Sequence, residues 1–370
     1  MADTLPPAPP REAPSTDARE AEPATRPLDV LEAPPEQAPK VAPSRKRRWW
    51  RLVALIVGLS LVLGAAASGG ALWLYARSVE GEIERVDAFA GVPEQARPPV
   101  VVEEALNYLV VGSDSRAPDS TDGSRTDAIL LMHVAADRKS GQMVSIPRDT
   151  WVQVPKSADG RHGGVQAKIN ASFAWGGAPL LVQTVESFTG VRINNVIIVD
   201  FAGFQEIIDT LGGVDIDVDA NFRSIHAPFR SFTKGPQRMD GATALDYARQ
   251  RYQFSDGDFT RVRHQQQLVR AVLTKATEKG LMKDPGRLNG FLRATAHSVS
   301  VDKGLDLFGT AWALRDLRAD DITSLTSPSQ STGMVGDQSV VFPDEEAAAG
   351  LYKAIQNDEM DTWLLENPQG

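Results

Sequence analysis

The chain has 370 residues, no cysteine and a formal net charge of -9 at pH 7. This length accommodates one large domain or two ordinary ones, together with appendages. The absence of cysteine excludes disulfides, thiolate metal sites and cysteine nucleophiles, and the acidic balance argues against a nucleic-acid-binding protein. A local basic cluster remains compatible with a phosphate ligand.

The N-terminal region divides into a polar tail and an apolar run. Residues 1–44 are rich in proline, alanine and acidic residues, so they bury too little apolar surface to fold and are expected to form a disordered cytoplasmic tail. Residues 45–76 begin with the basic stretch RKRRWWR and continue with an uncharged run over 52–75. This run is long enough for a single transmembrane helix through about 30 Å of hydrocarbon.

The basic residues before the apolar run predict a cytoplasmic N-terminus, and so a single-pass protein of the cell membrane whose remaining chain is extracytoplasmic. The alternative is a cleaved signal peptide. The apolar core of a signal peptide is only about 7–15 residues long, which favours the membrane anchor.

The elements predicted after the anchor alternate between strands and helices. Residues 77–104 contain Gly- and Pro-marked turns and are interpreted as a juxtamembrane linker. Apolar runs bounded by turn residues predict strands over 106–112, 128–135, 142–146, 195–200 and 213–218, the second and third forming a hairpin. Helical spacing predicts helices over 169–190 and 201–212. The alternation predicts an α/β layered domain over 105–355, followed by a C-terminal tail over 356–370.

Several enzyme classes are disfavoured by missing motifs. The sequence contains no GxxxxGK loop, no GxGxxG after a strand, no GxSxG and no HExxH. Its histidines lack the spacing of metal ligands; they are His133, His162, His226, His264 and His297. Because ATP is scarce outside the membrane, an enzyme there is expected to use an activated group already present in its substrate.

Charged residues gather at the ends of three predicted strands. Asp114 follows the first strand, Arg125 and Asp127 precede the second, and Arg148 and Asp149 follow the third. Ligands of open α/β sheets collect at strand ends, so these side chains are expected to meet at one site.

In the stretch VSIPRDTWV, the charged residues Arg148 and Asp149 directly follow an apolar run that is predicted to be a strand. A buried ion pair would be costly there, so solvent or a charged ligand is expected nearby. Pro147 is expected to begin the turn that directs Arg148 toward this ligand, and Trp151 to pack beneath the loop.

A second basic group lies further along the chain, in LDYARQRY and GDFTRVRHQQQ. If Asp258 or Thr260 caps a helix here, Arg261 lies in its first turn with Gln265 one turn later on the same face. An arginine in a first turn opposes the helix dipole, so a nearby anion is expected. The other arginines of this stretch are Arg249, Arg251 and Arg263.

Seven motifs, in order, give the chain a resemblance to a known family. They are NYLVVGSDSR, GSRTDAILLMHV, VSIPRDTWVQVP, KINASFAWGG, VDFAGFQEIIDTLGGVDIDV, LDYARQRY and GDFTRVRHQQQLVRAVL. Together they resemble the LytR-CpsA-Psr family of bacterial cell-wall enzymes over roughly residues 105–355. The resemblance implies a mixed central sheet flanked by helices. It also implies a phosphotransferase that moves a glycopolymer from a polyprenyl-pyrophosphate carrier to peptidoglycan, forming a phosphodiester.

The same resemblance implies a role for individual residues. Asp114 and Asp127 match carboxylates that bind Mg²⁺, or Mn²⁺ in its place. The residues matching pyrophosphate contacts, with Arg125 added from its strand-end position, are Arg125, Arg148, Lys168, Arg249, Arg251, Arg261 and Gln265. The catalytic candidates are Arg148, Asp127 and Asp149. The chain departs from the family at His264, where an arginine is frequent.

Two other functions use the same residues. One is a metal-dependent hydrolase of the polyprenyl pyrophosphate, and the other is a non-catalytic, lipid-binding regulator of wall synthesis. The carrier's isoprenoid tail would need an apolar groove, for which the segments 178–188, 195–199 and 201–211 are candidates, although most of their residues are expected in the core.

Overall fold

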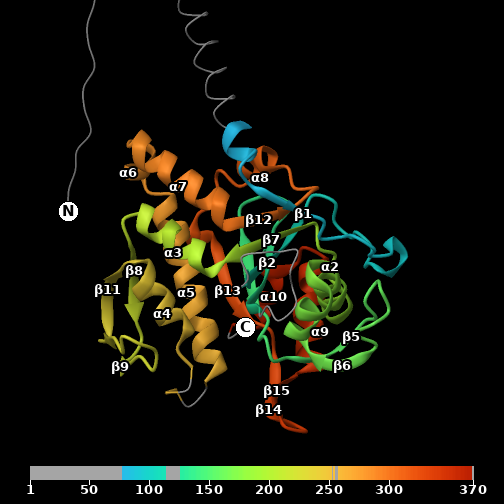
Figure 1. Cartoon of the computed structure of the whole chain (residues 1–370). Coiled ribbons are helices and arrows are strands. Elements are labelled where there is room, and N and C mark those ends of the chain that lie inside the picture. Colours follow the sequence, from blue (N-terminus) through green and yellow to red (C-terminus); the bar gives the residue numbers. More distant parts are fainter. Residues whose placement is uncertain (1–76, 114–125, 252, 255–256, 369–370) are drawn as a thin grey trace, which may run out of the picture. The chain divides into compact units, whose positions relative to one another are not determined.

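The computed structural model describes residues 77–368, except for 114–125, 252 and 255–256 (Figure 1). The predicted tail and apolar run, residues 1–76, lie outside the described residues. Across the part that is described, no helix combines the length and apolar character needed to cross a membrane.

A mixed sheet of seven strands forms the centre of the described fold. Its strand order is β1-β12-β7-β2-β3-β4-β13. The pairs β1/β12, β2/β7 and β4/β13 are parallel, and the remaining three pairs are antiparallel. The strands are β1 (Glu84–Val86), β2 (Leu106–Ser113), β3 (Thr126–Val134), β4 (Gly141–Ser145), β7 (Asn195–Asp200), β12 (Val299–Asp302) and β13 (Ile322–Thr326). The predicted mixed sheet is confirmed.

Helices cover both faces of this sheet (Figure 1). Leu109 and Leu131 pack against α2 (Ile169–Thr189) and α9 (Glu345–Gln356) in the largest apolar core. Leu130 lies beside Leu131 in sequence but packs on the opposite face, against Val269 of α5 (Asp258–Ala276). Successive side chains of a strand point to opposite faces, so β3 supplies both cores.

The face covered by α5 carries most of the remaining helices. They are α3 (Phe201–Thr210), α4 (Gly241–Arg249), α6 (Lys279–Met282), α7 (Pro285–Ser298) and α8 (Leu307–Ala313). Short 3₁₀ turns occur over Glu94–Ala96 and Ala319–Asp321. The helix predicted over 169–190 is present as α2, ends at Gly190 as expected and contains non-helical backbone at Gly176 and Gly177.

Four two-stranded ribbons lie outside the central sheet. They are β5 (Trp151–Val154) with β6 (Val165–Lys168), β8 (Val214–Val218) with β11 (Gly235–Met239), β9 (Phe222–Arg223) with β10 (Ser231–Phe232), and β14 (Ser329–Val335) with β15 (Gln338–Pro343). The strand predicted over 213–218 is therefore present but belongs to a ribbon. Its alternation of buried valine or isoleucine with exposed aspartate suits a strand that is covered on one face only.

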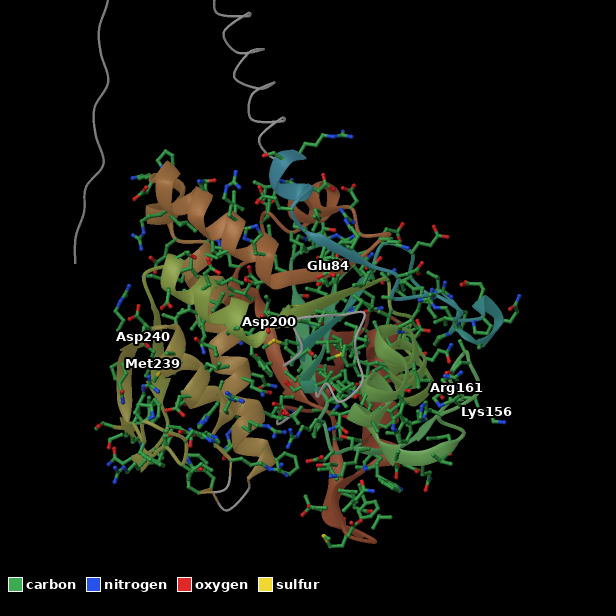
Figure 2. The ribbon with its side chains drawn as sticks, viewed as in Figure 1. Glu84, Lys156, Arg161, Asp200, Met239 and Asp240 are labelled. Carbon is green, nitrogen blue, oxygen red and sulfur yellow. The ribbon has the colours of Figure 1, made fainter. Side chains whose placement is uncertain are left out.

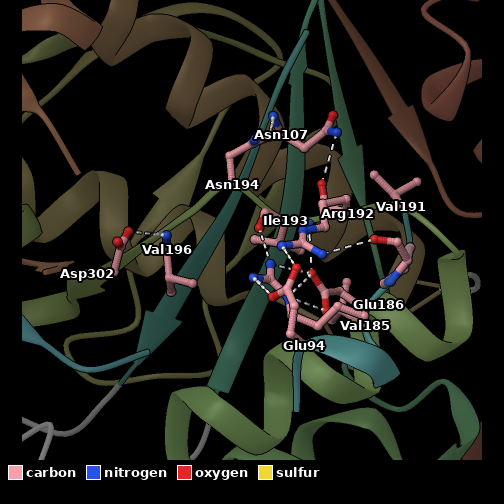
Figure 3. Close-up of polar contacts among 12 residues, drawn as sticks. Glu94, Asn107, Val185, Glu186, Val191, Arg192, Ile193, Asn194, Val196 and Asp302 are labelled. Atoms are coloured by element: carbon pink, nitrogen blue, oxygen red, sulfur yellow. Dashed lines mark hydrogen bonds and ion pairs between the residues drawn. The ribbon is translucent and has the colours of Figure 1, made fainter. Parts of the chain in front are cut away.

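The sequence predicts a linker over residues 77–104, whereas the structure shows that these residues form part of the domain. β1 pairs with β12, and Ala88 is buried in the main core. Arg97 binds Glu186 of α2 through Nη2 and Oε1 at 2.8 Å, although the Glu186 side chain is only 1% exposed. Figure 3 shows Glu186 beside Ile193, whose backbone nitrogen donates to Oε1 at 2.9 Å. Buried backbone and charged groups need such partners, which the segment and α2 supply to each other.

The sequence also predicts a C-terminal tail over 356–370, whereas the described residues of this segment pack against the domain. It contains α10 (Met360–Glu366), and Met360 is buried in the main core with Trp363 and Leu364 packed against it. Asp358, before α10, accepts from the buried His133 ring at 3.0 Å. These contacts make the C-terminal segment part of the domain.

Candidate active site

The sheet brings the predicted strand-end residues to one edge. Ser113 at the end of β2 lies opposite Thr126 at the start of β3 and beside Asp200 at the end of β7. Ser145 ends β4 opposite Leu130 of β3. Asp127 and the β4–β5 turn that carries Arg148 therefore lie at the same edge of the sheet.

A cavity of about 240 Å³ opens at this edge, between the sheet and helices α3, α4 and α5. Its polar lining residues are Asp127, Arg148, His226, Arg249, Arg251, Arg261 and Gln265. Its apolar lining residues are Val110, Ala128, Leu130, Val199, Phe201, Phe204, Leu245, Ala248, Leu268 and Val269. One cavity thus combines four arginines with an extensive apolar wall.

Two aspartates set the helices that form this wall. The Asp200 side chain caps α3 by accepting from the backbone nitrogens of Ala202 and Gly203, both at 3.3 Å, and lies where β7 meets the helix (Figure 2). Asp240 caps α4 by accepting from the Thr243 nitrogen at 2.8 Å. Capping satisfies backbone donors at the first turn, so each helix begins at a defined residue.

Arg148 contacts Asp127 directly, its Nη1 donating to Oδ1. The turn holding Arg148 begins at Pro147 as predicted. The Pro147 carbonyl accepts hydrogen bonds from the Thr150 nitrogen at 3.0 Å and from the Thr150 hydroxyl at 2.6 Å. Gln265 donates to the Asp127 carbonyl at 3.3 Å. The side chains of Arg148 and Asp127 remain 20% and 22% exposed, so both are accessible to a ligand in the cavity.

Asp149 lies behind this pair and organises three cations. Its Oδ1 is 3.0 Å from Lys168 Nζ, its Oδ2 is 3.2 Å from Arg251 Nη2, and Arg148 Nε is 3.8 Å from Oδ2. Asp149 is only 5% exposed, and the described lining of the cavity includes neither it nor Lys168. Its position indicates that it holds cations in place rather than contacting a ligand.

The remaining predicted cations come from the end of α4, the segment after it and α5. Arg249 is the exposed last residue of α4, and Arg251 follows two positions later. α5 begins at Asp258, and its N-cap is Gly257 without a side-chain hydrogen bond, so neither Asp258 nor Thr260 is the N-cap that the sequence suggested. Arg261 nevertheless lies in the first turn, with Gln265 one turn further. Arg261 is 5% exposed yet lines the cavity.

Two predicted site residues cannot be placed. Asp114 and Arg125 lie outside the described residues. The residues that are described contain no group of three or more histidine and carboxylate side chains suited to a metal ion. Asp127 is the carboxylate that they contribute to the cavity lining.

His264 and Arg263 do not join the cavity lining. The His264 ring is buried and stacks on Tyr247, with ring centroids 3.9 Å apart. Burial lowers the pKa of His264, against the opposing attraction of Asp219. Arg263 is exposed and donates to the Thr260 hydroxyl at 2.7 Å. The residue at the position where the family often has arginine is thus a core residue here.

The segments expected to line an apolar groove do so in part. Val199 and Phe201 line the cavity, whereas the apolar residues of α2, such as Leu181 and Val185, are buried in the core on the other face of the sheet. Sequence analysis did not single out Leu245, Leu268 or His226. A helix's apolar spacing identifies a buried stripe, but it does not show whether that stripe meets a core or a cavity.

These features define a class of protein: an α/β protein with a cavity suited to an amphiphile that has an anionic head and an apolar tail. The sequence model of the LytR_cpsA_psr family matches residues 79–357, and the chain belongs to this family.

Several curated relatives are named polyisoprenyl-teichoic acid–peptidoglycan teichoic acid transferase TagU, and two of them show the extent of the similarity. The protein from Bacillus cereus is 36% identical over 205 residues, which are 55% of this chain and 64% of the relative, less than two thirds of its length. The protein from Halalkalibacterium halodurans is 31% identical over 253 residues, covering 67% of this chain and 78% of the relative.

Solved structures share the fold. The crystal structure of Bacillus subtilis TagV superposes with a TM-score of 0.58 at 27% identity, covering 70% of this chain and 98% of that one. A LytR-Csp2A-Psr enzyme from Actinomyces oris gives a TM-score of 0.55 at 22% identity, covering 74% and 96%.

Proposed function

We propose that the protein is a membrane-anchored, extracytoplasmic phosphotransferase that attaches a glycopolymer from a polyprenyl-pyrophosphate carrier to peptidoglycan through a phosphodiester. The observation that carries this proposal is the single cavity in which Arg148, Arg249, Arg251 and Arg261 meet an apolar wall. The names of the curated relatives, which describe polyisoprenyl-linked donors and peptidoglycan acceptors, support the substrate class.

The four arginines would bind the pyrophosphate. Guanidinium groups remain charged and donate two parallel hydrogen bonds to phosphate oxygens. Asp149 keeps Arg251 and Lys168 near the cavity, so the cations are positioned before the ligand arrives. The isoprenoid tail would contact Phe201, Phe204 and Leu268, which line the same cavity. Each buried methylene contributes at most about 0.8 kcal/mol.

The transfer step forms one bond and breaks one bond. The acceptor hydroxyl oxygen bonds to the phosphorus that carries the glycan, and the bond from this phosphorus to the bridging oxygen breaks. Polyprenyl phosphate leaves with that oxygen and its electron pair. Positioning and charge stabilisation by the arginines suit such a reaction, which needs no covalent enzyme intermediate.

Asp127 is better placed than Asp149 to receive the acceptor's proton, because Asp127 lines the cavity and Asp149 lies behind it. Carboxylate oxygens also fit Mg²⁺ or Mn²⁺, and Asp127 with Asp114 would hold the ion. When bound, the ion would offset charge on the phosphate oxygens. The contact with Arg148 orients Asp127 in either role.

The membrane anchor is assigned to residues 52–75, whose uncharged sequence supports a single span. The basic residues at 45–51 support a cytoplasmic N-terminus. This topology would place the cavity outside the membrane, on the side where peptidoglycan lies.

The experiment uses the full-length chain in detergent with Mg²⁺ and a polyprenyl-pyrophosphate oligosaccharide, with and without peptidoglycan oligomers. Mass spectrometry should detect a conjugate only when the oligomers are present, and Arg148→Ala should abolish it. Free glycan phosphate formed equally in both reactions would instead identify a hydrolase. Donor binding without any product would identify a lipid-binding regulator.

A further inference from the structure

The outer face of the β5–β6 ribbon presents an aromatic ring and amide groups beside Lys168, one of the three cations that Asp149 contacts. Trp151 pairs with Lys168, and Gln153 pairs with Gln166. Residues directly opposite each other in an antiparallel pair project from the same face, as do residues two positions apart. All four side chains therefore share one face, which we name the ribbon platform.

Burial along the ribbon confirms which face is which. Val152 and Val154 are 5% and 0% exposed and belong to the main core. Trp151 is half-buried, and Gln153 and Gln166 are exposed. Trp151 therefore does not pack beneath its loop as expected from the sequence, because the strand's alternation places it on the outer face. Its indole nitrogen donates to Gln166 Oε1 at 3.2 Å, which orients the ring.

The ribbon platform is connected to the cavity by a series of charged side chains in contact with one another. Arg148 and Arg251 line the cavity, Asp149 contacts both, and Lys168 contacts Asp149 at 3.0 Å. Trp151 lies opposite Lys168, so its Cβ is roughly 5 Å from that of Lys168. A donor whose tail occupied the apolar cavity and whose phosphates contacted Arg148 and Arg251 would bring its glycan end toward Lys168 and Trp151.

We propose that the ribbon platform binds the sugar that is bonded to the donor's pyrophosphate. This inference rests on the proposed function. A pyranose ring has an apolar C–H face that packs on an indole, and hydroxyl groups that pair with amides. Trp151 supplies the ring, Gln153 and Gln166 supply the amides, and Lys168 supplies a cation for the adjoining phosphate. The platform extends about 7 Å from Trp151 to Gln153 along β5, the scale of a single sugar ring.

The test compares two ligands on the full-length chain in detergent: polyprenyl pyrophosphate bearing a disaccharide, and polyprenyl pyrophosphate without sugar. We expect Trp151→Ala to weaken binding of the glycosylated ligand roughly 10-fold and to leave the sugarless ligand within about twofold. Trp151→Phe should retain most of the affinity. Arg148→Ala, the matched control, should weaken binding of both ligands.

Three results would overturn the inference. One is an equal loss for both ligands in Trp151→Ala, and another is no loss for either. The third is unchanged donor binding with a raised KM for peptidoglycan oligomers, which would assign the platform to the acceptor. The melting temperature of Trp151→Ala is measured alongside. If its fold is lost, the double variant Gln153→Ala with Gln166→Ala, at two exposed positions of the platform, replaces it with the same expected selectivity for the glycosylated ligand. Failure of wild type to bind either ligand would count against the proposed function itself.

Discussion

Asp149 Oδ2 lies 3.2 Å from Arg251 Nη2, joining two positions that are 102 residues apart in the chain. The same carboxylate holds Lys168 at 3.0 Å through Oδ1. Asp149 thus connects the β4–β5 turn, the start of α2 and the end of α4 at one point, and it sets the spacing of the cations around the cavity.

Replacing Asp149 should damage both the fold and the site. In Asp149→Ala, three neighbouring cations lose their shared anion, so we expect the free energy of unfolding to fall by about 3 kcal/mol. Urea denaturation measures this change. Arg148→Ala removes a partly exposed ion-pair partner and should cost at most about 1 kcal/mol while abolishing transfer. A loss of several kcal/mol in Arg148→Ala would show that Arg148 is primarily structural.

The apolar wall predicts a dependence on the length of the isoprenoid tail. Wild-type affinity should rise as the tail is lengthened, until the cavity is filled. Phe201→Gln introduces an amide into this wall and should flatten the dependence. Calorimetric binding of donors with short and long tails measures the effect. The same slope in both proteins would place the tail elsewhere.

The ion pair between Arg97 and Glu186 predicts a large stability effect far from the cavity. Arg97→Ala leaves the buried Glu186 without its cation and should lower the free energy of unfolding by about 3 kcal/mol. The double variant Arg97→Met with Glu186→Gln should recover most of this loss, since it removes the buried charge while the amide oxygen can still accept from the Ile193 nitrogen. Thermal and urea unfolding of both variants test this pair, and an unstable double variant would contradict the explanation.

Asp240 predicts a pH-dependent contribution to stability. Hydrogen bonds from the Thr243 side chain and backbone hold the pKa of Asp240 below its usual range. The folded form thus binds the proton less tightly than the unfolded chain, so the cap is fully stabilising above about pH 4 and is lost as the pH falls below that value. Asp240→Ala should cost about 1 kcal/mol at pH 7.

The difference between wild type and Asp240→Ala should be smaller at pH 3 than at pH 7, because at pH 3 the unfolded chain binds a proton at Asp240 more readily than the folded protein does. Urea denaturation at the two pH values measures it, with Asp240→Asn as a capping control that does not titrate. An identical difference at both pH values would mean that the carboxylate charge has no part in the cap.

Strong local patterns made much of the fold predictable. β2, β3, β4 and β7 are apolar runs bounded by turn residues, and each lies within two residues of its expected position. β1, with three residues, has no such pattern, and its partner β12 lies more than 200 positions away. The pairing of β1 depends on tertiary contacts, which a short stretch of sequence does not reveal.

The sequence indicated which residues belong to the candidate site better than it indicated how they are arranged in space. The family resemblance grouped Arg148, Lys168, Arg251 and Arg261. In the structure the three arginines line one cavity, and Lys168 contacts Asp149 behind it. The sequence did not show that Asp149 faces away from the cavity, because burial of a turn residue depends on which segments pack over it. Leu245 and Leu268 were missed because apolar spacing alone does not separate a cavity wall from a core.

The most direct test of the proposed phosphotransfer follows the phosphate that is bonded to the glycan. A donor carrying ³²P in this phosphate is incubated with the full-length chain, Mg²⁺ and peptidoglycan oligomers, and the label is located after separation of lipid and glycan. We predict that the label appears in the glycan–peptidoglycan conjugate and that Arg148→Ala forms none. Label retained on the polyprenyl carrier while glycan joins peptidoglycan would mean that the sugar–oxygen bond breaks, which would contradict phosphotransfer.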